Sequence, residues 1–263
     1  MKKIYYGNNE HQFGELRLPE GDGPHPVTVV IHGGFWRSEY GIEQINAVAE
    51  NLAENGWATW NIEYRRVGHE GGSWPGTLLD VAYAADYVRT LANTYSLQLD
   101  NVVTIGHSAG GHLALWLAGR HRLPDSSELH TQDPLKIKSA VSLAGVTDLR
   151  LMHKVHDIRN QAVGGEPSNP TADLLGGSPG EVANRYNEAS PSALLPLDVH
   201  QVLVHGALDV HVPVGISQHY YREAEEFGDF VKLVELPNAE HFMIVDPSTD
   251  AWAEILQEME LLK

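Results

Sequence analysis

The chain has 263 residues, of which 42% are hydrophobic and 20% charged, and its formal net charge is -17. This length suits one α/β domain with a large core. The negative charge excludes nucleic acid and anionic membrane as expected partners, because both would be repelled. The sequence contains no cysteine, which excludes disulfides, cysteine nucleophiles and thiolate metal sites.

The N-terminal residues include two lysines but lack the apolar run of a signal peptide. No stretch approaches the roughly 20 apolar residues of a membrane span. We therefore expect a cytoplasmic protein that acts on a small molecule without a membrane partner. The sequence leaves the oligomeric state open, a homo-oligomer included.

Short apolar runs alternate with helical patterns along the chain, which is typical of a mostly parallel sheet. The expected strands are residues 13–18, 27–31, 57–63, 102–107, 140–144, 202–205 and 231–235. The expected helices are residues 42–55, 77–95, 111–120, 215–227 and 249–262. The prediction is an α/β three-layer sandwich: a twisted central sheet of about eight strands, with helices on both faces, in one domain spanning residues 1–263.

One segment, residues 145–197, interrupts this alternation. Its prolines and glycines, including Gly164-Gly165-Glu166-Pro167, predict short helices and loops. An insertion at this point lies above the carboxyl ends of the strands, where α/β sheets bind ligands. We expect residues 145–197 to form a lid or pocket wall, and an insertion without such a role is the alternative.

The pentapeptide Gly106-His107-Ser108-Ala109-Gly110 follows a predicted strand and precedes a predicted helix. A sharp strand-to-helix turn exposes a serine hydroxyl, and its flanking residues must be small because strand and helix almost touch. Glycine also occupies position 111. We predict that Ser108 is a nucleophile, whereas an ordinary glycine-rich turn would give the same string without any chemistry.

A nucleophilic serine needs a base, and the base needs an orienting acid, in the chain order Ser, acid, His. Asp209 follows the expected strand at 202–205, and His241 follows the one at 231–235. Both loops open on the same sheet edge as Ser108. We predict a catalytic triad of Ser108, Asp209 and His241.

Other assignments of the acid and base are open at this point. Asp209 could serve only as a helix N-cap, and His241 could be a structural loop residue. His211 and His219 are not expected to reach Ser108. The remaining candidates for the acid are Asp148, Glu240 and Asp246.

The expected strand at 27–31 runs into His32-Gly33-Gly34-Phe35-Trp36. A tetrahedral intermediate needs backbone donors aimed at its oxygen, and a glycine pair lets amides turn inward. We predict an oxyanion hole made by the amides of Gly34, Phe35 and Ala109, although an ordinary turn would share this string. Residues expected to line the substrate pocket are Trp36, His107 and Phe242.

The sequence contains 15 histidines, which are common metal ligands, so a metal site is a further hypothesis. Residues 153–157 have ligand spacing on a helix, and His205, Asp209 and His211 could converge. The sequence contains neither an HExxH string nor a glycine-rich phosphate loop. We therefore predict neither a metal nor another cofactor.

These motifs resemble the α/β-hydrolase fold, and within it the bacterial esterase and kynurenine-formamidase-like group. His32-Gly33-Gly34-Phe35-Trp36 is similar to that group's H-G-G-x-W, and the run from Gly106 to His112 is similar to its nucleophile turn. The likeness extends from about residue 10 to 260. Two further blocks resemble the acid loop and the histidine loop of that family: Gly206-x-x-Asp209-x-x-Val212-Pro213 and Glu240-His241-Phe242.

The resemblance implies a serine hydrolase that cleaves a carboxylic ester or activated amide through an acyl-enzyme intermediate. Phe35 replaces the third glycine of the H-G-G-G string in the hormone-sensitive-lipase-like branch, which favours the formamidase-like side. Carboxylesterase, arylformamidase and acyl-peptidase activities all remain open. A non-catalytic binding protein on this fold is the alternative of a different class.

Overall fold

The computed structural model describes residues 1–163 and 167–263, so the run Gly164-Gly165-Glu166, part of the evidence for loops in the segment 145–197, lies outside the described residues. Eight strands form one sheet in the order β1-β2-β4-β3-β5-β6-β7-β8. The pairs β1/β2 and β2/β4 are antiparallel, and every later pair is parallel. The strands are β1 Lys2–Tyr5, β2 Phe13–Arg17, β3 His25–Ile31, β4 Ala58–Ile62, β5 Leu97–His107, β6 Ser139–Leu143, β7 His200–Gly206 and β8 Val231–Leu236.

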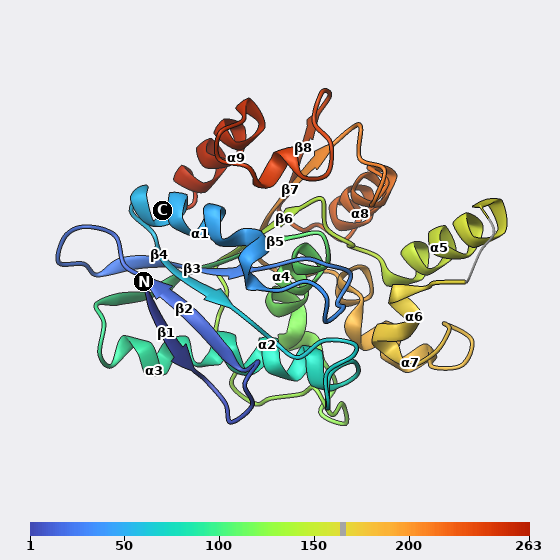
Figure 1. The fold of residues 1–263 in the computed structure, drawn as a ribbon, viewed down its shortest axis with the longest axis horizontal. Coiled ribbons are helices and arrows are strands. Elements are labelled where there is room, and N and C mark those ends of the chain that lie inside the picture. The colour runs from blue at the N-terminus through green and yellow to red at the C-terminus, as the bar shows by residue number, and fades with distance from the viewer. Residues whose placement is uncertain (164–166) are drawn as a thin grey trace.

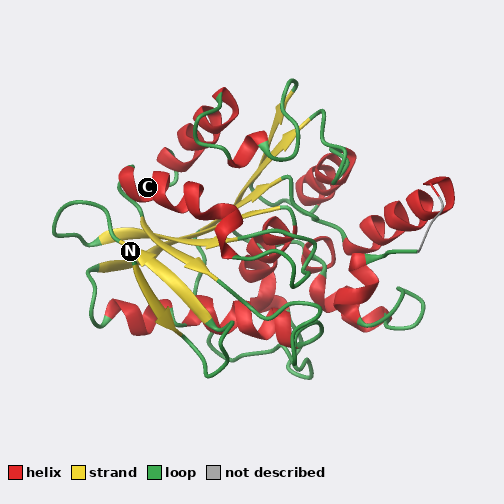
Figure 2. Cartoon of the chain, in the orientation of Figure 1, coloured by secondary structure: helices red, strands yellow, loops and turns green. Residues whose placement is uncertain are grey.

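Helices cover both faces of this sheet, which confirms the predicted three-layer fold (Figures 1 and 2). Four helices precede β6: α1 Asn46–Glu54, α2 Gly76–Asp86, α3 Val88–Ala92 and α4 Ala109–Gly119. The later helices are α5 Leu149–Val163, α6 Pro170–Leu175, α7 Ala183–Ala189, α8 Gly215–Glu226 and α9 Asp250–Glu260. The pattern at 77–95 predicted one helix, whereas the structure has α2 and α3 separated at Tyr87.

The two sides of β3 belong to two different cores. Val27, Val29 and Ile31 belong to the core that also includes residues of α2, α4 and α8, whereas Val30 belongs to the core that includes residues of α1 and α9. Successive side chains of a strand point to opposite faces, so an apolar run without alternation can be buried on both. Figure 1 shows α1 and α9 on one side of the sheet and α2 and α3 on the other.

The segment between β6 and β7 holds α5, α6 and α7, which Figure 1 shows gathered on one side of the molecule with α5 projecting outward. The 15 residues of α5 make it longer than the short helices that the sequence predicted. In the described part of the chain, each helix is too short or too polar to cross a membrane.

Candidate active site

Ser108 lies between the end of β5 and the start of α4, with φ +56° and ψ -117°. A residue with a side chain is strained in such a conformation, by about 1–3 kcal/mol. The surroundings hold the strain: Ser108 N donates to Leu143 O at 2.8 Å, and a Cβ on Gly110 would overlap Ile31 O. The close approach of β3, β5 and β6 therefore holds the turn that presents the Ser108 hydroxyl.

Asp209 and His241 follow the neighbouring parallel strands β7 and β8, and their side chains meet. His241 Nδ1 lies 2.6 Å from Asp209 Oδ2, and both side chains are buried. A Cβ on Gly206 would overlap Ala239 O, so the two loops approach too closely for any larger residue there. The carboxyl edge of the sheet thus brings together an imidazole and a carboxylate from distant parts of the chain.

The backbone also holds the Asp209 carboxylate. Its Oδ1 accepts hydrogen bonds from the amides of His211 at 2.8 Å and Val212 at 2.9 Å. Burial alone would raise the pKa of Asp209, but hydrogen bonds from His205 and His241 outweigh it and hold the pKa well below its usual range. Asp209 is therefore ionised at neutral pH.

The three other candidate acids are engaged elsewhere. Asp148 Oδ1 accepts the amide of Leu151 at the start of α5. Glu240 accepts backbone amides of its own loop, and Asp246 accepts from Ser248. In the described part of the chain, the carboxylate bonded to the ring of His241 is that of Asp209.

A cavity of about 100 Å³ joins the loops that follow β3, β5, β7 and β8. Its lining residues are Gly34, Phe35, Tyr40, Gln44, His107, Ser108, His211, His241 and Phe242. Among the described residues, no hydrogen bond joins Ser108 Oγ to the His241 ring, although both line this cavity. Such contacts are often loose in an unliganded site and tighten around substrate.

His211 lines this cavity, although its position two residues after Asp209 was not expected to bring it near Ser108. Its ring centroid lies 5.0 Å from that of His241. The reason is the turn at Asp209, whose carboxylate binds the amides of residues 211 and 212 and folds the loop back. An aspartate that accepts amides two and three residues ahead is a common turn signal, and it could have indicated this placement.

The loop after β3 carries three successive residues with positive φ: Gly34 at +97°, Phe35 at +49° and Trp36 at +57°. Within the described residues, the amides of Gly34 and Phe35 donate to no acceptor. The amide of Ala109 lies in the first turn of α4, where helices leave N–H groups free. A Cβ on Gly33 would lie 2.8 Å from His107 O, so glycine allows the close approach of the two loops.

A buried charge network that the sequence analysis missed anchors this loop. Glu63 Oε1 lies 3.1 Å from His32 Nε2 and 3.0 Å from Arg66 Nη2. Burial raises the pKa of Glu63, but the hydrogen bond and charge of His32 and the charge of Arg66 outweigh it and lower the pKa from 4.5 to about 2. The signal in the sequence was a glutamate at the end of an apolar strand run.

Two of the three predicted pocket residues line the cavity, and one does not. His107 Nε2 donates to the carbonyl of His241 at 2.9 Å, and burial lowers the pKa of His107 to about 3, so its ring is neutral. Phe242 is half-exposed at the rim. Trp36 is fully buried, and its Nε1 donates to His112 Nδ1 at 3.2 Å, so it lies outside the lining.

One set of three metal-ligating side chains comes together within residues 1–163 and 167–263: Asp148, His219 and Glu223. All three are partly exposed, and none of them lines the cavity that contains Ser108. Asp148 has a separate role as the N-cap of α5.

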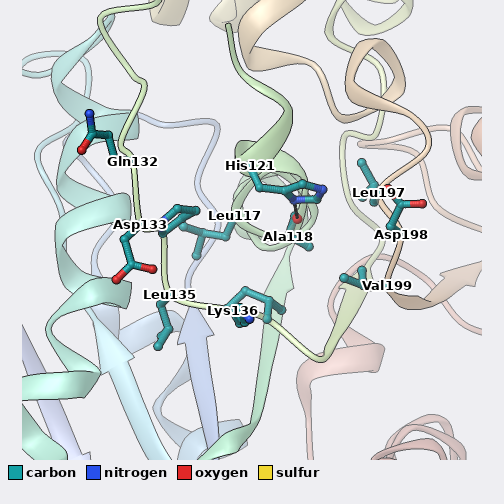
Figure 3. Close-up of a pocket in the computed structure, with 12 residues that line it drawn as sticks. Leu117, Ala118, His121, Gln132, Asp133, Leu135, Lys136, Leu197, Asp198 and Val199 are labelled. Carbon is teal, nitrogen blue, oxygen red and sulfur yellow. Dashed lines mark hydrogen bonds between the residues drawn. The ribbon is translucent and has the colours of Figure 1, made fainter. Parts of the chain in front are cut away.

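A second and larger hollow, of about 410 Å³, lies at the amino ends of β6 and β7 (Figure 3). Figure 3 shows Asp133 and Asp198 on opposite sides of it, with His121 between them. Its lining has no serine, and its charged side chains Asp133, Lys136 and Asp198 are exposed. Of these two cavities in the described part of the chain, the smaller one combines a strained serine with a buried imidazole, and that imidazole contacts the buried carboxylate of Asp209.

The sheet order and the strand-turn-helix element at Ser108 define an α/β-hydrolase fold. A comparison with protein families matches residues 15–223 to the BD-FAE family. The chain belongs to this family.

The chain is also similar to individual hydrolases. The chain is 28% identical over 243 residues to a probable carboxylic ester hydrolase, LipM, of Mycobacterium tuberculosis, covering 90% of this chain and 54% of LipM. It is 24% identical to a kynurenine formamidase of Danio rerio, covering 95% and 77%. A solved carbohydrate esterase from gut microbiota has the same fold, with a TM-score of 0.82 at 19% identity, covering 100% and 95%. The chain thus spans about half the length of its mycobacterial relative.

Proposed function

We propose that this protein is a serine hydrolase that cleaves carboxylic esters of small molecules, with Ser108 as nucleophile, His241 as base and Asp209 as orienting acid. The observation that carries the proposal is the 2.6 Å contact between His241 and Asp209 in the loops beside the strained Ser108 turn. The named ester hydrolase among the relatives supports the same reaction class.

In this mechanism, His241 Nε2 accepts the Ser108 proton as Oγ bonds to the ester carbonyl carbon. The carbonyl oxygen becomes an oxyanion, and the amides of Gly34, Phe35 and Ala109 stabilise it. The C–O bond to the leaving group then breaks, and His241 returns the proton to the departing alcohol. Water attacks the acyl-enzyme in the same way, giving the acid and free Ser108.

We propose further that residues 145–163 and 167–197, none of which lines the cavity that contains Ser108, support its walls from outside within a single domain, 1–263. Two contacts support this role. Arg159 on α5 donates, at 2.8 Å, to the carbonyl of His211, a residue of the loop that carries Asp209. In the loop after β3, Arg37 pairs with Asp173 on α6 at 2.9 Å. The insertion thus braces two of the loops that line the cavity.

A cavity of about 100 Å³ favours small acyl groups. Formamide hydrolysis is the second candidate activity, because a formyl group is the smallest acyl group and a kynurenine formamidase aligns with 95% of the chain. Both activities would use the same residues. They differ in the leaving group, an alcohol in one and an amine in the other.

Two measurements test the proposal. A fluorophosphonate probe is expected to form a covalent adduct at Ser108 in the folded protein and none in Ser108→Ala. Hydrolysis of p-nitrophenyl esters of graded chain length, measured beside N-formylkynurenine, is expected to be fastest for the shortest acyl chains. A folded protein that forms no adduct and hydrolyses none of these compounds would instead be a binding protein.

A further inference from the structure

His205, the penultimate residue of β7, has no part in the mechanism above, yet it is fully buried beside the acid. Its Nε2 lies 2.9 Å from Val212 O and 3.2 Å from Asp209 Oδ2. Its Nδ1 lies 2.7 Å from Ser217 Oγ on α8. Both nitrogens of this ring therefore have partners, and one partner is the carboxylate that binds His241.

The partners of His205 determine where its proton lies. The carbonyl oxygen of Val212 can only accept a hydrogen bond, so the Nε2 facing it carries hydrogen. Ser217 Oγ can either donate or accept, so it satisfies Nδ1 in the neutral and in the charged ring alike. In either state the one Nε2–H therefore donates to Val212 O, and Asp209 Oδ2 lies beside that hydrogen, 3.2 Å from Nε2.

The Asp209 carboxylate consequently has four donors around it. Oδ1 receives the amides of His211 and Val212, Oδ2 receives the ring of His241, and the Nε2–H of His205 lies beside Oδ2 with Nε2 at 3.2 Å. The backbone donors alone fix one oxygen and leave the plane of the carboxylate free to twist about it. An N–H group on a rigid strand beside Oδ2, shared between Val212 O and Asp209, restricts that twist.

Given the proposed function, on which this step depends, we infer that His205 is a positioning residue. Its Nε2–H, shared between Val212 O and Asp209 Oδ2, holds Oδ2 at the angle that receives the Nδ1–H of His241. The pKa of Asp209 agrees with this role. Burial raises that pKa, and the hydrogen bond from His205 is the largest of the effects that lower it. His205 thus helps to keep the buried carboxylate ionised as well as oriented.

Variants at position 205 separate this role from simple packing. In Gln the amide nitrogen reaches the place of Nε2, whereas in Asn the amide falls near Nδ1. We expect His205→Asn to lower kcat about 10- to 100-fold, the range for a hydrogen bond to a charged group, with KM unchanged. His205→Gln should recover most of the lost rate. His200→Asn, at the other end of β7 beside Phe230, is the control and should keep the parent kcat.

The pH profile gives a readout that lost packing would not move. Within the described residues, the ionisable side chains against His241 are Asp209, His107 and His211. A misaligned Asp209 stabilises the imidazolium less, so the acid limb of kcat/KM should move to lower pH in His205→Asn. A smaller folded fraction would lower the rate without moving this limb, so the limb decides the test even if the variant is unstable.

A double variant completes the test. If His205 acts through Asp209, then His205→Asn combined with Asp209→Asn should be no slower than Asp209→Asn alone. Losses that multiply, or an unmoved acid limb in His205→Asn, would overturn the inference while leaving the triad standing. An Asp209→Asn variant with full activity would instead remove the proposed acid itself, so the two failures are distinguishable.

Discussion

Each end of the sheet carries a hollow, and the smaller of the two has the buried polar groups while the larger has exposed charges. At the carboxyl ends, a cavity of about 100 Å³ is lined by Ser108 and His241, both almost fully buried. At the amino ends, a hollow of about 410 Å³ is lined by exposed charges such as Asp133 and Lys136. Buried groups that contact one another alter each other's proton affinity and orientation, whereas exposed charges interact mainly with water. Burial and mutual contact, rather than volume, therefore favour the smaller cavity as the proposed active site.

The difference has its origin in the loops. Those at the carboxyl ends approach one another at glycines: Gly33 lies against His107, and Gly206 lies against Ala239. Such approaches leave a small cavity but hold its polar groups in fixed positions. Substitutions in these loops and in the larger hollow therefore perturb one end of the sheet at a time.

The largest effect is expected from removing the base. His241→Ala should lower kcat by about 10⁴-fold or more, and adding Ser108→Ala should cost little further, because triad residues act as a unit. The matched control is His121→Ala in the larger hollow, which should leave kcat unchanged. Initial rates with a p-nitrophenyl ester test this, and losses that multiply in the double variant would contradict the shared role.

A smaller loss is expected from disturbing the oxyanion loop. Gly34 has φ +97°, and a Cβ there would overlap Tyr40, so Gly34→Ala should shift the amides that face the oxyanion. Losing one such donor lowers kcat by about 10²- to 10³-fold.

Gly228→Ala is the control for this backbone strain. Gly228 has φ +83° with open space around its Cα, so the substitution should lower the Tm and leave kcat as it was. Thermal melting measured beside kcat separates strain from catalysis. Equal kcat losses in the two variants would show that strain alone explains the effect of Gly34→Ala.

The sequence predicted the parts of this arrangement that depend on local pattern. The strand-turn-helix element at Ser108 follows from small residues placed between an apolar run and a helical pattern. Asp209 and His241 each follow a strand, and parallel strands end at one edge, so their proximity follows from chain order. The alternation of strands and helices was enough to predict the three-layer fold.

The features that it could not predict depend on long-range contacts or on exposed segments. The strand β1 is mostly exposed, so its residues show no buried face. Glu63 becomes an anchor only because the fold brings His32 and Arg66 to it. Trp36 carries an unusual positive φ that turns its ring under the loop toward His112, a direction that no spacing rule gives.

The Glu63 network should give the carboxyl end a pH-dependent stability that the amino end lacks. A carboxyl whose pKa falls from 4.5 to about 2 on folding stabilises the fold above pH 4.5, by about 3 kcal/mol. That contribution is lost as the pH falls towards 2. Glu63→Gln should therefore lower the free energy of unfolding at pH 7, with a difference that shrinks from pH 4.5 downward.

Urea unfolding at several pH values measures this difference. The control is Asp133→Asn at the amino end, where the aspartate is 85% exposed and lies 3.4 Å from Arg89. Its free energy of unfolding should match that of the parent at every pH. A Glu63→Gln deficit that stays constant down to pH 3 would assign the loss to packing rather than to the ionised carboxylate.

The smallest effects should separate the two ends most cleanly, because each variant removes apolar surface from one hollow. Phe242 is half-exposed at the rim of the smaller cavity. Phe242→Ala should therefore remove apolar contact area that the protein offers to the substrate and weaken substrate binding by about 1 kcal/mol. We expect kcat/KM to fall about fivefold through a higher KM. Val199 is half-buried in the larger hollow, so Val199→Ala should lower the free energy of unfolding by about 1 kcal/mol with unchanged kinetics. A kinetic defect in Val199→Ala would mean that the larger hollow takes part in catalysis.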